Sequence, residues 1–145
     1  MHQLNRILSL LGVVAMLFST NAIADGDHSK LHDNMEEMQD YYRTLSRGIR
    51  MATPESTPEL LEATRKLQLL ALESKALEPD MIAEAPEADR AKLIRDYQLR
   101  MIATVKAALD LEVALINGDM GQANESFEQL KQDRRLGHQE FKVDD

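Results

Sequence analysis

The sequence predicts an all-α fold, an antiparallel up-down-up-down four-helix bundle that forms one domain. Four segments carry apolar residues at alternating steps of three and four, the spacing of helices that pack against one another. Only 6 Gly and 4 Pro occur among the 145 residues, too few for the many turns of a β architecture. The connections between the segments are short, and short connections favour antiparallel neighbours.

Residues 1–24 are predicted to be a secretory signal peptide. They contain Arg6 and no acidic residue, then the apolar run Ile7 to Phe18, and they end in Ala22-Ile23-Ala24 before Asp25. A membrane anchor is less favoured, because the apolar run is shorter than the ~20 residues that span a bilayer. We therefore expect residues 25–145 to be the mature bundle, working beyond a membrane without attachment to it, in the periplasm if the source is bacterial.

The first helix is predicted to begin near Lys30, with Ser29 as its N-cap. A linker at residues 51–58 ends it, Thr57-Pro58 begins the second helix, and Glu78-Pro79 stops that helix. The apolar stripes are Leu31, Met35, Met38, Tyr42, Leu45 and Ile49 in the first helix and Leu60, Ala63, Leu67, Leu70, Ser74 and Leu77 in the second.

Residues 80–87, which include Pro86, are predicted to form a polar loop. The third helix follows and ends at Asn117-Gly118, where glycine can adopt a positive φ. Asp119 is the expected N-cap of the fourth helix. The stripe of the third helix is Ile94, Tyr97, Met101, Thr104, Ala108, Leu111 and Leu115, and that of the fourth is Ala123, Phe127, Leu130, Arg134, His138 and Phe141. The fourth stripe is therefore apolar except for Arg134 and His138.

Met35 and His138 are predicted to point into the core and to face each other. In an up-down-up-down bundle the start of the first helix and the end of the fourth share one pole, and these two residues lie at similar depth on their stripes. A thioether and an imidazole form a known axial pair for haem iron. The same pole is predicted to collect mostly apolar walls from Met38, Leu70, Ser74, Leu77, Ile94, Tyr97 and Met101.

Two neighbours of His138 fit a haem hypothesis. Arg134, one turn earlier, can meet a haem propionate, and Gly137 can leave space for a macrocycle. Simpler interpretations stay open beside it: Met35 can fill the core, His138 can be a favourable charge at a helix C-terminus, and Arg134 can extend to solvent.

The first and fourth predicted helices contain the stretch Leu31-His32-Asp33-Asn34-Met35-Glu36 and the segment from Gln129-Leu130-Lys131 through Arg134 to His138-Gln139-Glu140-Phe141. Together they resemble the cytochrome b562 family, itself a standard example of the up-down-up-down bundle. The resemblance covers the whole mature chain at low identity. It implies a periplasmic electron carrier that holds one non-covalent haem b at one end of the bundle, with Met35 and His138 as axial ligands.

The chain departs from the family pattern in the expected pocket. Where the best-known member has two phenylalanines on the third helix, this sequence has Tyr97 and Met101, and Gly137 replaces a tyrosine beside the histidine. Met38 and Arg134 complete the set of residues that we expect around the haem. These changes alter the polarity and packing of the pocket, which are among the factors that set haem affinity and potential.

The composition excludes several classes of function. A net charge of −8 gives no basic surface for nucleic acid or an anionic membrane. The absence of Cys excludes disulfides, thiolate zinc sites, iron–sulfur clusters and covalent c-type haem. The sequence has no phosphate loop, His-Glu-x-x-His motif or nucleophile elbow, and no Glu-x-x-His for a di-iron site, so we do not expect an enzyme.

The acidic surface is expected to guide the chain, as a monomer, to a redox partner protein with a basic docking patch. Two other functions remain as alternatives. One is a haem-free helical-bundle module for binding or stress response in the periplasm. The other is a copper or zinc site between His28 and His32, which stand four residues apart but lack a third strong ligand nearby.

Overall fold

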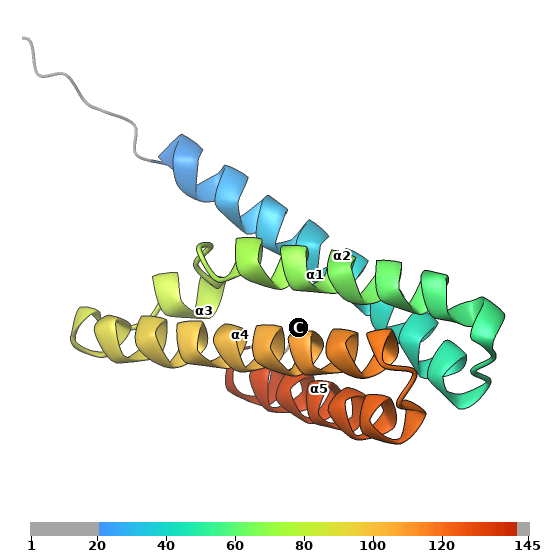
Figure 1. Cartoon of the computed structure of the whole chain (residues 1–145). Helices are drawn as coiled ribbons and strands as arrows, with labels where there is room; N and C mark the ends of the chain where they lie inside the picture. The colour runs from blue at the N-terminus through green and yellow to red at the C-terminus, as the bar shows by residue number, and fades with distance from the viewer. Residues whose placement is uncertain (1–20, 142–145) are drawn as a thin grey trace, which may run out of the picture.

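The computed structural model describes the backbone of residues 21–141 and the side chains of residues 30–53 and 55–141. Its helices are α1 (Asn21–Arg50), the short 3-10 helix η1 (Pro54–Ser56), α2 (Thr57–Ser74), α3 (Asp80–Ala83), α4 (Glu87–Ile116) and α5 (Met120–Phe141) (Figure 1). No strand occurs in residues 21–141. The all-α prediction is therefore confirmed for the part of the chain that the structure describes.

The long helices form a helical bundle. Helix α1 packs on α2, α2 on α4, α4 on α5, and α5 on α1, while the short α3 packs on α4. The contact between α1 and α5 is the least extensive of the four, and the first turns of α1 extend beyond the other helices (Figure 1). The bundle is therefore most open where α1 and α5 meet.

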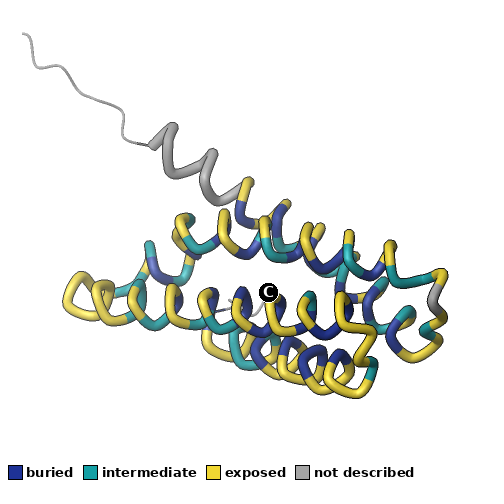
Figure 2. The backbone as a smooth tube through the Cα atoms, in the orientation of Figure 1, coloured by how far each residue is buried: buried dark blue, intermediate teal, exposed yellow. Residues whose placement is uncertain are grey.

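The predicted apolar stripes form the core of this bundle. Leu45, Leu67, Leu111 and Leu130, one from each long helix, have no exposed surface. Figure 2 shows the buried positions along the inner sides of the helices. Each such leucine contributes about 1.5–3 kcal/mol relative to an exposed one. The stripe members that are not fully buried are Met35, Leu70, Leu77, Ile94, Arg134 and His138.

The predicted start of the first helix is wrong. Helix α1 begins at Asn21, so Ser29 lies inside the helix and does not cap it. No proline stands between Asn21 and Arg50, and the single Gly26 costs a helix only about 1 kcal/mol, which does not end it. The predicted signal peptide falls mostly on residues 1–20, which lie outside the described residues. Within the described residues, no helix is both long and apolar enough to cross a bilayer.

The segment after the second helix also differs from the prediction. Helix α2 ends at Ser74 and continues as a turn in which the Leu77 N–H donates to the Ser74 carbonyl at 3.0 Å. Residues 80–87 are not only a polar loop, because α3 forms there after Pro79, whose backbone is extended. Ile82 on α3 has no exposed surface, and the burial of this side chain holds the short helix against the bundle.

Two predicted turn residues are confirmed, and one close contact was not foreseen. Gly118 has φ of 69°, and the side chain of Asp119 caps α5 by accepting the Gln122 N–H at 3.0 Å. On α1, a Cβ atom at Gly48 would overlap with the side chain of Leu60 on α2. The two helices approach this closely because residue 48 is glycine.

Candidate functional site

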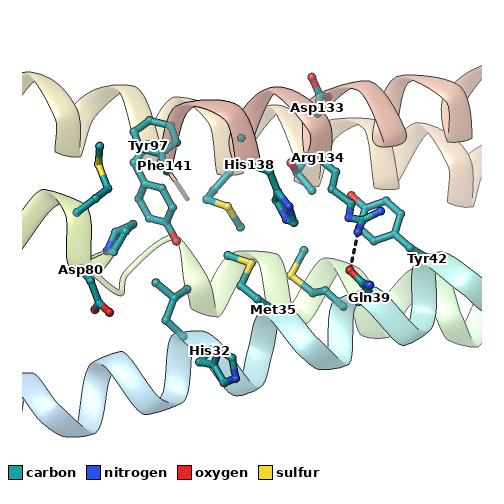
Figure 3. Close-up of a pocket in the computed structure, with 17 residues that line it drawn as sticks. His32, Met35, Gln39, Tyr42, Asp80, Tyr97, Asp133, Arg134, His138 and Phe141 are labelled. Atoms are coloured by element: carbon teal, nitrogen blue, oxygen red, sulfur yellow. Dashed lines mark hydrogen bonds between the residues drawn. The ribbon is translucent and has the colours of Figure 1, made fainter. Parts of the chain in front are cut away.

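A pocket of about 420 Å³ opens between α1, α3, α4 and α5 (Figure 3). This volume falls in the range of about 300–1,000 Å³ that is usual for small-molecule and cofactor sites. Helix α1 lines it with Leu31, His32, Met35, Met38, Gln39 and Tyr42, the α3 region with Pro79, Asp80 and Met81, α4 with Tyr97, Met101 and Thr104, and α5 with Asp133, Arg134, Gly137, His138 and Phe141.

The pocket brings together the two predicted axial ligands and four of the residues that the sequence predicts beside the haem. Met38 and Met35 come from α1, Tyr97 and Met101 from α4, and Arg134 and His138 from α5. Figure 3 shows the Met35 and His138 side chains pointing toward one another across the pocket.

The prediction that His138 lies inside the core is wrong, because this residue is exposed at the edge of the pocket, while Met35 is half-buried. The reason is its position. His138 lies three residues before the end of α5, and the contact between α5 and α1 is the least extensive among the four packed pairs of long helices. The imidazole therefore borders both the pocket and solvent.

Part of the predicted wall lies elsewhere. Leu70, Ser74, Leu77 and Ile94 do not line the pocket, and Pro79, Asp80 and Met81 do. The Tyr97 hydroxyl donates to the Ser74 carbonyl at 2.7 Å, and Asn34 Nδ2 donates to Ser74 Oγ at 3.2 Å. These bonds hold α1, α2 and α4 together at the C-terminal end of α2. The pocket is therefore bordered by α3 and not by α2. The apolar pair Met81-Ile82 within the predicted loop was the available signal for this element.

An aromatic pair closes one side of the pocket. The rings of Tyr97 and Phe141 meet edge to face, with centroids 5.4 Å apart and planes at 78°. Such pairs contribute about 0.5–1.5 kcal/mol beyond the area they bury. Burial raises the pKa of the Tyr97 phenol well above its ordinary value. The phenol is therefore neutral in the folded protein and serves as a hydrogen-bond donor.

Stability is expected to fall in alkali. Because the pKa of Tyr97 is raised in the folded state, only the unfolded chain ionises at its ordinary pKa of about 10, so the free energy of unfolding declines above that pH. Tyr97→Phe is expected to cost about 0.5–1.5 kcal/mol near pH 8, through the lost bond to Ser74, and to weaken the alkaline decline. Urea unfolding of both proteins between about pH 8 and about pH 11 measures this. Parallel declines in the two proteins would contradict it.

Arg134 holds a positive charge on the pocket wall. Its Nη2 donates to Gln39 Oε1 on α1, and its guanidinium carbon lies 5.3 Å from the centroid of the Tyr42 ring. Burial raises the pKa of Tyr42 strongly, although Arg134 acts in the opposite direction. Asp133, buried beside Arg134, accepts a hydrogen bond from Gln129 Nε2 at 3.2 Å. Sequence reasoning did not single out Gln39, Tyr42 or Asp133 as site residues.

Gly137 acts at a helix contact as well as at the pocket. It lines the pocket, but the nearest atom that a Cβ at this position would meet is Arg100 Cγ of α4, at 3.4 Å. A side chain at this position would therefore make close van der Waals contact with α4.

Within the described residues, no group of three or more His, Cys, Asp and Glu side chains is placed to hold a metal ion. Of the suggested His28–His32 site, the His28 side chain lies outside the described side chains. The exposed His32 lies beside Glu36, with Nε2 and Oε1 3.6 Å apart. A metal in the pocket would therefore need at least one ligand of another kind.

No protein-family model matches the chain, and no curated protein matches it.

Proposed function

We propose that the chain is a periplasmic electron-transfer protein that binds one non-covalent haem b through Met35 and His138. In this proposal the four long helices form an antiparallel up-down-up-down bundle, and a leader at residues 1–24 directs the chain across a membrane and is removed. The observation that carries the proposal is the convergence of Met35 on α1 and His138 on α5 at opposite sides of one pocket.

The residues present fit such a group. A thioether and a neutral imidazole are a recognised axial pair for haem iron, and the chain has no Cys for covalent attachment. Met38 and Met101, at 5% and 6% exposure, and Tyr97 supply the largely apolar wall that a macrocycle requires. When bound, haem supplies one-electron oxidation and reduction at its iron.

The roles of the two proposed ligands and of Arg134 follow from the chemistry of their side chains. With Met35 and His138 both holding the iron, the site would leave no ligand position for a substrate, which would suit electron transfer rather than catalysis. A soft methionine ligand favours the ferrous state and raises the potential relative to two histidines. Arg134, already on the pocket wall, offers a charged donor to a propionate.

The chain's charge indicates the kind of partner. With a net charge of −8, a monomer would be attracted to a redox protein with a basic docking patch. Such an encounter is accelerated by opposite charges and weakened by salt.

A haem titration of the purified chain tests the proposal. We expect binding of one haem per chain and a low-spin spectrum in both oxidation states, because two strong axial ligands are available. Protein that remains colourless, or that gives only the spectrum of free haem, would contradict the proposal and would favour a haem-free helical-bundle module.

A further inference from the structure

The pocket gathers thioether sulfurs. Of the eight methionines in the sequence, Met35, Met38, Met81 and Met101 line it. Met35 and Met38 are three residues apart on α1, so one turn of the helix presents both to the pocket. Met101 lines the same pocket from α4 and His138 from α5, and Figure 3 shows the Met35 side chain pointing toward the His138 imidazole.

These donors select for a soft metal ion. Thioethers favour Cu(I) over hard divalent ions, and imidazole is also a good copper ligand. Met38 and Met101 are almost fully buried, so an ion held between them would be largely removed from water. Because these ligands are uncharged, they do not neutralise the charge of a bound ion. Burial of a univalent ion such as Cu(I) therefore costs less free energy than burial of a divalent ion.

Harder ions lack the ligands they need. Zinc sites are built from Cys, His and carboxylates, and calcium and magnesium sites from oxygen ligands. Among the described residues no group of three or more His, Cys, Asp and Glu is suitably placed. The donor set of this pocket therefore favours a univalent soft ion.

We propose that Met35, Met38, Met101 and His138 bind one Cu(I) ion in this pocket. The inference depends on the pocket and its sulfur donors and not on the proposed binding of haem. Because both groups would use Met35 and His138, haem and Cu(I) exclude one another.

Competition with a chromogenic Cu(I) chelator such as bicinchoninate, under anaerobic conditions, tests this in the haem-free full chain. We expect the protein to withdraw one equivalent of Cu(I) and X-ray absorption to show mainly sulfur ligands. Zn(II), the matched negative probe, is expected not to be retained. Failure to withdraw Cu(I), or a ligand shell of only nitrogen and oxygen, would overturn the proposal.

Three methionine variants locate the site. Met38→Leu and Met101→Leu keep side-chain volume while removing sulfur, and each is expected to weaken Cu(I) binding about tenfold or more. The control is Met51→Leu, since Met51 is 74% exposed and lies outside the pocket. Urea midpoints of all three establish that they fold. Wild-type affinity in folded Met38→Leu and Met101→Leu would overturn the assignment.

Haem and copper are measured separately, so each proposal can fail alone. A chain that withdraws Cu(I) but stays colourless with haem would contradict the proposed function and leave the copper site standing. A chain that binds haem but never withdraws Cu(I) would contradict the copper site and leave the proposed function standing. Cu(I) uptake by the haem-saturated protein would place the copper elsewhere and overturn this inference.

Discussion

His138→Ala is expected to abolish the low-spin haem spectrum. The substitution removes the imidazole while Met35 stays in place, leaving a weakly held high-spin haem or no haem at all. Loss of a direct ligand should exceed the 10- to 100-fold effect of losing a ligand's supporting hydrogen bond, so haem affinity is expected to fall by more than about 100-fold. Absorption spectra of the titrated variant, before and after reduction, measure both effects.

Two controls separate ligation from damage to the fold. Because His138 is exposed at the edge of the pocket, imidazole added to the solution can reach the space left by the alanine and is expected to restore a low-spin spectrum. Gln139→Ala changes an exposed residue of the same helix that does not line the pocket and is expected to leave the spectrum unaltered. A wild-type spectrum in His138→Ala without added imidazole would rule out His138 as the ligand.

Periodicity predicted the parts of the fold that depend on long amphipathic helices. Leu45 and Ile49 of the first stripe, and Leu111 and Leu115 of the third, are buried as expected, because burial of apolar area is the largest favourable term in folding. Gly118 and Asp119 were predictable because a positive φ and an N-cap each demand a particular side-chain chemistry.

Short elements and helix ends were less predictable. Helix α3 has four residues, too few to display a helical period, and its position depends on the burial of Ile82 by the rest of the bundle. The exposure of His138 depends on how closely α1 approaches α5, which is a matter of tertiary packing. A helical pattern gives the direction of a side chain from its axis but not the distance to the facing helix.

Hydrogen bonds between buried polar groups were the other part that sequence reasoning missed. Asn34 and Ser74 are buried and hydrogen-bonded to each other, although they are 40 residues apart. Asp133 is buried beside the pocket and bonded to Gln129 within α5. Such residues are tolerated inside a protein only with partners, and those of Asn34 are brought together by the folded chain.

Leu67→Ala and Leu69→Ala are expected to differ greatly in their effect on stability. Both leucines lie in α2, but Leu67 has no exposed surface and Leu69 is 63% exposed. Truncating Leu67 removes buried area and leaves a cavity among the helices, which costs about 2–5 kcal/mol. Truncating Leu69 exposes no core, and alanine is at least as good a helix former, so its effect should stay within about 0.5 kcal/mol.

Urea unfolding of the haem-free chain measures this difference directly. With a slope of about 1–3 kcal/mol per M urea, the Leu67→Ala midpoint is expected to fall by about 1 M or more, while Leu69→Ala stays near the wild type. The same slope in all three proteins is needed to interpret the midpoints as changes in stability. Equal decreases of the urea midpoint in the two variants would mean that α2 does not present Leu67 to the core. Such a result would contradict the packing of α2 against α1 and α4.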